Sequence, residues 1–210
     1  MSVLRMASWS YSEDFVGVPP LIDEAGREGA EMGAAPVKPA VGSALRLLAA
    51  AGQAKHVVEV GTGAGASGLW LLEGMSDTGI LTTIDIEPGI TNVARRTFRN
   101  AGIPSQRTRL INGDANDVLP RLTDAAYDLV FIDADIASYQ HYVDQSIRLL
   151  RPGGVLLIDN MLYGDRVADP AIRDKATVLV RDLGKSLRDD ERLQSTLLPV
   201  GDGLFSGIRQ

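Results

Sequence analysis

The chain has 210 residues, of which 45% are hydrophobic, and it carries a formal net charge of −6 with no cysteine. This length fits one domain with a sizeable core, the acidic balance argues against nucleic acid and anionic membranes as partners, and a chain without cysteine forms neither disulfides nor thiolate metal sites. No apolar run reaches the roughly 18 residues of a membrane span, and residues 1–10 lack the apolar stretch of about 7–15 residues found in secretory signals, so we expect a cytoplasmic protein.

The first third of the chain is predicted to be helical. Ser10 and Glu13 have the spacing of a capping box, which predicts a helix that begins at Ser10. Pro19-Pro20 would end that helix and begin another. We therefore expect one domain over 1–210, with an N-terminal helical segment at 1–35 and an alternating core at 36–210.

From residue 36 onward, a loop is followed by alternating helices and strands. Helices are predicted over 41–51, 69–75, 90–101, 114–122, 139–150 and 171–187. Strands are predicted over 56–60, 80–85, 108–111, 127–133, 155–159, 193–200 and 203–209. The alternation predicts an α/β fold with a mostly parallel sheet and helices on both faces. Residues 151–154 are predicted to form a turn, and the short turn at Gly201-Asp202 predicts an antiparallel closing pair.

Four of the predicted strands end at a glycine or an acidic residue. These residues are Gly61, Asp85, Asp133 and Asp159. In an open parallel sheet, ligands bind beyond the carboxyl ends of the strands. The recurrence therefore indicates a ligand site at that edge.

A glycine-rich loop at 61–68 follows the first strand and opens a helix. Glycines let a backbone approach a ligand closely, and exposed N–H groups at a helix start bind polar or anionic groups. Asp85 ends the next strand, 20 positions after Gly65, where a carboxylate can accept both hydroxyls of a ribose. A tight packing turn and a helix cap are the alternatives, but together the two features favour a nucleoside-containing cofactor.

Glu59 separates the two cofactors that such a loop could bind. A carboxylate inside the glycine motif would repel the pyrophosphate of NAD, whereas it suits the cationic sulfonium and ammonium groups of S-adenosylmethionine. Gly113-Asp114-Ala115 lies where an adenine edge would be read, although an ordinary turn is an equal interpretation. The residues therefore favour S-adenosylmethionine.

Acidic and amide side chains gather after two later strands. Asp133 and Asp135 follow one strand, and Asp159 and Asn160 follow the next. If these strands are neighbours, Asp133, Asp159 and Asn160 converge. Oxygen ligands of this kind suit Mg²⁺, Mn²⁺ or Ca²⁺. The alternative is that the two aspartates cap loops or form salt bridges.

At these residues the sequence resembles the cation-dependent O-methyltransferase family, which includes catechol and caffeoyl-CoA O-methyltransferases and many small bacterial enzymes. The resemblance runs from about Val37 to the C-terminus. The sequence is also similar to actinobacterial O-methyltransferases that share the stretches Val-Gly-Thr-Gly-Ala-Gly and Thr-Ile-Asp-Ile-Glu-Pro. The matching stretches are Glu59-Val60-Gly61-Thr62-Gly63, Ile84-Asp85, Phe131-Ile132-Asp133-Ala134-Asp135, Ile158-Asp159-Asn160 and Leu198-Pro199-Val200-Gly201-Asp202-Gly203.

The resemblance implies a Rossmann-like class I methyltransferase of seven strands with the last strand inserted antiparallel. It implies methyl transfer from S-adenosylmethionine to a hydroxyl of a small, aromatic vicinal-diol acceptor, and a homodimer. Asp133, Asp159 and Asn160 would hold a divalent cation, Mg²⁺ first, and Asp133 would also serve catalysis and acceptor binding. The implied cofactor contacts are Val37, Glu59, Gly61, Thr62, Ser67, Asp85, Ile86, Ala115 and Asp135.

The sequence departs from the family pattern at two positions. Ile136 stands where the family has a lysine near the reacting hydroxyl, and Ala40 replaces an acidic residue after the loop proline. The first change makes a cofactor-binding protein with weak or no catalysis the main alternative. An NAD-dependent oxidoreductase would need a Tyr/Lys or His pair at strand ends, and a nucleic-acid methyltransferase would need a basic face; the sequence offers neither.

Several aromatic and imidazole side chains have two interpretations each. His141 is a base or a surface residue of its helix. Tyr139 and Tyr142 line the cofactor or pack the helix. Trp9 and Tyr11 cover the acceptor or contact a second subunit.

Overall fold

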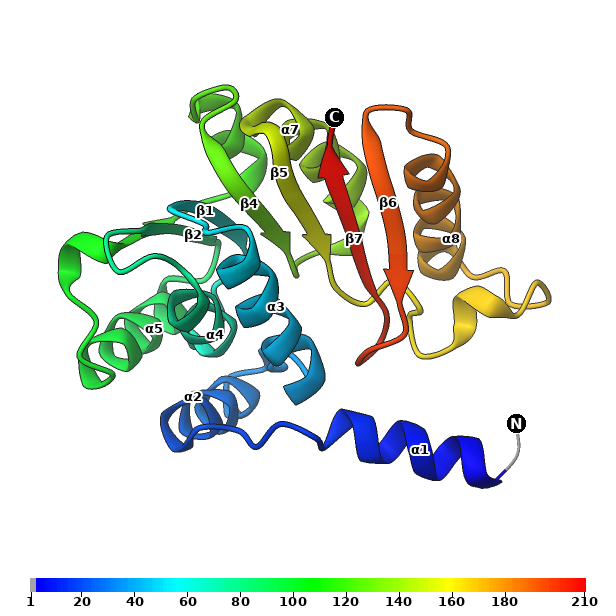
Figure 1. Cartoon of the computed structure of the whole chain (residues 1–210), viewed down its shortest axis with the longest axis horizontal. Helices are drawn as coiled ribbons and strands as arrows, with labels where there is room; N and C mark the ends of the chain where they lie inside the picture. The colour runs from blue at the N-terminus through cyan, green and yellow to red at the C-terminus, as the bar shows by residue number, and fades with distance from the viewer. Residues whose placement is uncertain (1–2) are drawn as a thin grey trace.

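The computed structural model describes residues 3–210, with side chains from Met6 onward, so the first two residues of the predicted segment 1–35 lie outside the described residues (Figure 1). The strands are β1 (His56–Val60), β2 (Ile80–Asp85), β3 (Thr108–Asn112), β4 (Tyr127–Ile132), β5 (Leu150–Ile158), β6 (Leu193–Leu198) and β7 (Leu204–Arg209). The helices are α1 (Val3–Glu13), α2 (Pro20–Glu31), α3 (Pro39–Ala51), α4 (Ala66–Gly74), α5 (Pro88–Asn100), α6 (Ala115–Val118), α7 (Tyr139–Leu149) and α8 (Lys175–Arg188). Short 3₁₀ turns are η1 (Ser105–Arg107), η2 (Leu119–Arg121), η3 (Ile136–Ser138) and η4 (Arg166–Ala168).

The seven strands form one sheet in the order β3-β2-β1-β4-β5-β7-β6. The pairs from β3 across to β5 are parallel, while β7 pairs antiparallel with both β5 and β6. A strand that enters through a tight turn must reverse direction, and the turn at 201–203 uses two glycines with φ of +59° and +86°. The predicted seven-stranded sheet with an inserted antiparallel strand is confirmed.

Helices cover both faces of the sheet, as the alternation predicts. Because successive strand residues point to opposite faces, Val57 packs with α2–α5 in one apolar cluster and Val58 packs with α6–α8 in the other. Both valines are fully buried. Double coverage explains why the central strands read as continuous apolar runs. None of the helices within residues 3–210 has the length and apolar character needed to span a membrane.

The prediction that a helix begins at Ser10 is wrong. Helix α1 begins at Val3, so Ser10 lies inside it and its carbonyl accepts a hydrogen bond from the Asp14 N–H. The Glu13 carboxylate accepts from the Trp9 indole and the Gly201 N–H instead of capping a helix start. The prediction that Pro19-Pro20 begins a helix is confirmed, since α2 starts at Pro20.

The predicted turn at 151–154 is also wrong, because β5 runs through it. Tyr127 pairs with Leu150 and Leu129 pairs with Val155, so the intervening residues form an irregularity inside the strand. Gly153 has φ of +79° there, a conformation that glycine adopts without strain. Several helix starts also shift: α4 begins three residues earlier than predicted, α3 and α5 begin two residues earlier, and α8 begins four residues later.

Candidate functional site

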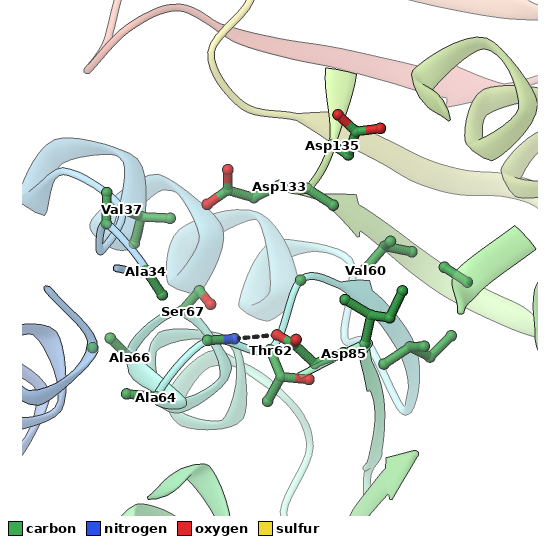
Figure 2. A pocket seen from close by; sticks show the side chains of 18 of the residues that line it. Ala34, Val37, Val60, Thr62, Ala64, Ala66, Ser67, Asp85, Asp133 and Asp135 are labelled. Atoms are coloured by element: carbon green, nitrogen blue, oxygen red, sulfur yellow. Dashed lines mark hydrogen bonds between the residues drawn. The ribbon is translucent and has the colours of Figure 1, made fainter. Parts of the chain in front are cut away.

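A cavity of about 490 Å³ lies at the carboxyl ends of the central strands. Its walls come from the loops after β1, β2, β3 and β4 and from α2 with the loop that follows it (Figure 2). From β1 the chain continues outward to β2 and β3 on one side, whereas β4 and β5 lie on the other. Ligands in open α/β sheets bind at this kind of switch point.

The glycine loop is folded tightly against the end of β4. Gly61 has φ of +98°, and a side chain there would overlap the carbonyl oxygen of Asp133. Gly65, with φ of +91°, precedes the first turn of α4. The loop is therefore both a tight packing turn and a wall of the cavity, so the two sequence interpretations hold together.

Asp85 braces the glycine loop from the end of β2. Its Oδ2 accepts a hydrogen bond from the Gly63 N–H at 2.8 Å, drawn in Figure 2, and its Oδ1 accepts from the Glu87 N–H at 3.0 Å. Asp85 also lines the cavity. Because a carboxylate has about four lone-pair sites, acceptor capacity remains for ligand hydroxyls.

Glu59 lies behind the cavity wall and is fully buried. Its carboxylate accepts hydrogen bonds from Ser67 Oγ at 2.7 Å and Thr83 Oγ1 at 2.6 Å, and Thr83 Oγ1 lies 2.6 Å from Thr62 Oγ1. Burial raises the pKa of Glu59 to about 7, against the lowering effect of these hydrogen bonds. Thr62 and Ser67 line the cavity while Glu59 does not. The structure therefore places the carboxyl group of Glu59 one layer behind the cavity wall.

Eight of the nine predicted cofactor contacts lie on the cavity wall. Ile86 is at the rim, with 61% of its surface exposed. Asp114, on the same stretch as Ala115, caps α6 by accepting from the Asn116 N–H at 2.8 Å. The eight are Val37, Gly61, Thr62, Ser67, Asp85, Ile86, Ala115 and Asp135.

The sequence analysis missed the contribution of α2 to the cavity. Gly26 and Gly29 line it, and an added Cβ would come within 3.2 Å of Pro36 Cβ at the first and of Ala64 Cβ at the second. The signal was present as small residues at i and i+3 in a helix of otherwise polar composition. That spacing lets a helix approach a neighbouring loop closely.

The structure also decides between the interpretations of the helix α7 residues. Both tyrosines are buried in the apolar cluster beneath α7, and Tyr142 also lines the cavity, whereas Tyr139 does not. His141 is not on the cavity wall, and its Nε2 is buried without a hydrogen-bond partner among the described residues. Its ring lies edge-on to that of Tyr142, with the centroids 6.5 Å apart, so His141 lies behind a residue of the wall.

Asp133, Asp159 and Asn160 come together beside the cavity, as predicted. Strands β4 and β5 are parallel neighbours with Ile132 opposite Ile158, which puts their carboxyl ends level. Asn160 Nδ2 donates to Asp133 Oδ1 at 2.9 Å, and Asp159 Oδ1 accepts from the Asn160 N–H at 2.8 Å. Asp133 also lines the cavity, so it connects the cavity to this cluster.

The two aspartates of the cluster lie close together, with Asp159 buried and Asp133 partly buried. Burial raises the pKa of Asp133 to about 6, and burial followed by the charge of Asp133 raises the pKa of Asp159 to about 7. Neither forms an ion pair with the side chains that the structure describes, nor do three or more His, Cys, Asp or Glu residues of that part gather as a metal cage. Two carboxylates and an amide oxygen fit a hard divalent cation, whose charge would relieve their repulsion.

The turn between β6 and β7 holds two neighbouring segments. Gly164 N–H donates to both carboxylate oxygens of Asp202, at 2.7 and 2.9 Å, and Leu162 N–H donates to the Asp202 carbonyl at 2.7 Å. Gly201 N–H donates to Glu13 Oε1 at 2.8 Å. Nothing local in the sequence connects Glu13 with Gly201, so the sequence analysis missed this junction.

Both departures from the family pattern lie away from the cavity wall. Ile136 begins η3 and packs against the apolar cluster under α7 and α8, to which Tyr163 and Val167 also belong. Ala40 is buried in the first turn of α3. The side chain at position 136 is thus occupied in packing.

Residues 21–210 match the sequence profile of the O-methyltransferase family. A Mycobacterium avium (strain 104) protein named as an O-methyltransferase is 49% identical over 208 residues, covering 99% of this chain and 91% of that protein. Among solved structures, the O-methyltransferase TomG from Streptomyces achromogenes, in complex with S-adenosylmethionine, has a TM-score of 0.86 at 27% identity with 100% of both chains covered. The O-methyltransferase from Bacillus cereus in complex with S-adenosylhomocysteine has a TM-score of 0.85 at 25% identity, covering 98% of this chain and 100% of that one.

Proposed function

Because this chain belongs to the O-methyltransferase family, we propose that it transfers the methyl group of S-adenosylmethionine to a hydroxyl of a small aromatic acceptor with two adjacent oxygens, with the help of a divalent cation. The observation that carries the proposal is one shared wall. Asp133 lines the cavity and also contacts Asn160 in the acidic cluster. A methyl donor in the cavity and an acceptor at the cluster would therefore meet at Asp133.

The cavity offers each part of S-adenosylmethionine a matching group. Asp85 would accept the ribose hydroxyls, and the backbone of the glycine loop would lie against the rest of the nucleoside. Glu59 lies behind Ser67, and its negative charge would attract the cationic sulfonium and ammonium groups. A bound cation would in turn favour the ionised form of Glu59. The complexes of the two solved relatives with S-adenosylmethionine and S-adenosylhomocysteine support this choice.

Asp133, Asp159 and Asn160 would hold the divalent cation. When bound, that cation stabilises negative charge on an acceptor oxygen, which matters because a neutral phenol with a pKa of about 10 is a poor nucleophile. The chain itself supplies alignment. Asp133 lines the cavity and would fix the position of the acceptor relative to the methyl donor. The α2 face and the loop at 33–37 also line the cavity and would shield the donor from water.

We also propose that the protein forms a homodimer, because the side chains of Tyr11 and Phe15, which are 70% and 71% exposed, would suit a subunit interface. A binding protein with weak catalysis is the second candidate, favoured by one observation, that Ile136 is packed in an apolar cluster and offers no base. Turnover against a panel of catechols separates an enzyme from a binding protein.

Calorimetry tests the proposed cofactor. S-adenosylhomocysteine should bind and NAD should not, and Asp85→Ala should weaken binding by about 1–3 kcal/mol because buried hydroxyls lose their acceptor. Asp77→Ala, which removes an exposed carboxylate in the loop before β2, is the matched control and should leave affinity unchanged. Tighter binding of NAD than of S-adenosylhomocysteine would overturn the proposal.

A further inference from the structure

Helix α1 lies beyond the carboxyl ends of the strands, where the acceptor would bind. Figure 1 shows α1 on the side toward which the β4 and β5 arrowheads point, next to the turn between β6 and β7. One carboxylate joins the helix to that turn, since Glu13 Oε1 accepts from the Gly201 N–H at 2.8 Å. The two residues are 188 positions apart in the chain, so this is a tertiary contact that holds the N-terminal segment in place.

The same turn holds the loop that carries Asn160. Asp202 accepts from the N–H groups of Leu162 and Gly164, and the Met161 N–H donates to the Gly203 carbonyl at 2.9 Å. The turn lies close against this loop, because a side chain at Gly203 would come within 2.8 Å of the Leu162 nitrogen. The loop after β5 and helix α1 are thus both hydrogen-bonded to the same turn.

The orientation of α1 is defined by which of its side chains are covered. Trp9 and Glu13 are one helical turn apart, so they share a face, and Trp9 Nε1 donates to Glu13 Oε1 at 3.3 Å. Both are partly buried, whereas Tyr11 is 70% exposed. The face with Trp9 and Glu13 is therefore the one turned toward the β6–β7 turn, which also holds the loop that carries Asn160.

We propose that Glu13 is a positioning residue that fastens α1 to the β6–β7 turn, so that Trp9 forms a wall of the acceptor site. The inference rests on the proposed function and adds a basis for acceptor choice. An indole offers a broad, rigid apolar face to a flat ring, and a wall fixed by a hydrogen bond costs less entropy on binding than a mobile one. Acceptor binding should therefore depend on Glu13, while cofactor binding should not.

Fluorescence quenching tests the position of Trp9 without any turnover. The chain has two tryptophans, and Trp70 is 1% exposed, so acrylamide in solution reports on Trp9. Glu13→Ala should raise the quenching constant clearly above that of the wild type. Glu13→Gln keeps an oxygen that can accept from Gly201 and should restore wild-type quenching. Asp14→Ala removes the next carboxylate, which is exposed, and serves as the control.

Kinetics with a catechol that the wild type methylates then test the wall. Glu13→Ala and Trp9→Ala should each raise the KM for the acceptor roughly tenfold, the factor expected for one lost charge-assisted hydrogen bond or contact of similar strength. The kcat and the affinity for S-adenosylhomocysteine should stay near wild type. Glu13→Gln and Asp14→Ala should resemble the wild type.

Three results would overturn the inference. They are unchanged quenching in Glu13→Ala, equal effects of Glu13→Ala and Glu13→Gln, or an unchanged acceptor KM in Trp9→Ala. If Glu13→Ala fails to fold, Trp9→Ala still decides the wall because it leaves the contact between Glu13 and Gly201 in place. If the wild type methylates no acceptor, the proposed function fails, and the quenching comparison still decides whether Glu13 holds Trp9.

Discussion

At the scale of single residues, the site depends on carboxylates that the fold removes from water. Glu59 is buried behind the glycine loop and satisfied by the hydroxyls of Ser67 and Thr83. At the neighbouring strand ends, Asp159 is buried and Asp133 is partly buried. Burial without a nearby cation favours the protonated form of a carboxyl group. Ionisation of these groups near neutral pH therefore lowers the stability of the ligand-free protein, at the positions where positively charged ligands would bind.

Glu59 should make the stability of the ligand-free protein fall as pH rises. Its folded pKa of about 7 lies above the ordinary value of 4.5, so the folded state keeps a proton that the unfolded chain has lost. Stability from this group is complete below about pH 4.5 and lost as pH rises to about 7, by up to about 3 kcal/mol. Denaturant unfolding of wild type and Glu59→Gln at pH 5 to 8 should show a smaller decline in the variant.

The comparison between these two proteins isolates Glu59, because Asp133 and Asp159 titrate in both. Glu24→Gln, at an exposed position of α2, is the control and should follow the wild type. Parallel curves for wild type and Glu59→Gln would contradict the assigned role of burial.

Ile136 should limit the rate at neutral pH. Its side chain packs against apolar neighbours, so it offers no charge to an ionising hydroxyl. Ile136→Lys can keep its methylene stem on the same surface and extend its ammonium group beyond it. We expect the neutral-pH rate to rise about 10²-fold, at the low end of general acid–base effects, and the wild-type rate to increase from pH 6 to 9. Ile136→Met should behave like wild type, and a flat wild-type profile with no gain in Ile136→Lys would show that another group activates the acceptor.

At the scale of elements, the loop after β1 must lie against the end of β4 for the site to exist. Gly61 allows this contact, since any Cβ there would meet the Asp133 carbonyl oxygen. The contact ties the cofactor cavity to the residue that also belongs to the acidic cluster. The β6–β7 turn plays a similar part at the other end of the site, because it fastens both α1 and the loop after β5.

Gly61→Ala should therefore damage both stability and cofactor binding. Its φ of +98° and the overlap with Asp133 require the loop and β4 to move apart, and we expect a loss above about 3 kcal/mol in the free energy of unfolding. Gly102→Ala is the control, because Gly102 has φ of +70° with nothing within 4 Å of an added Cβ. That change should cost about 1 kcal/mol. Equal losses in denaturant unfolding would mean that only the backbone angle matters at Gly61.

At the scale of the whole molecule, charge is the dominant constraint on the site. The net charge of −6 adds to the repulsion between Asp133 and Asp159, and the charges of Asp202 and Glu13 also act on Asp159. A divalent cation would relieve this repulsion and tie two strand ends together. Cation binding should therefore be visible in global stability as well as in activity.

Mg²⁺ or Mn²⁺ at about 100 times its dissociation constant should raise the melting temperature by about 5–10 °C. Asp159→Ala should lose this increase, because it removes one ligand of the pair. In the wild type, a chelator should abolish methyl transfer and added Mg²⁺ should restore it. Full activity of Asp159→Ala in the presence of chelator would show that the cluster has a structural role only.

Much of the fold was predictable because its signals are local. The limits of β1 and β2 follow from β-branched runs, and Asp85, Asp133 and Asp159 follow from the rule that chemistry gathers at strand ends. Where prediction failed, a distant contact outweighed the local pattern. Ser10 matched a capping box, yet Glu13 binds Gly201, and the Pro-Gly-Gly run at 152–154 continues a strand because β4 lies beside it.

The sequence by itself determined the class of the protein, the strands and the identity of the groups at their ends, because periodicity, turn residues and motif spacing are properties of neighbouring positions. Only the tertiary structure decided that Glu59 lies behind the cavity wall, that α2 helps to enclose the cavity, and that Glu13 reaches the last turn of the sheet. These outcomes depend on how residues far apart in the chain share one buried space. Burial and long-range hydrogen bonds come from packing of the whole chain, which no local pattern encodes.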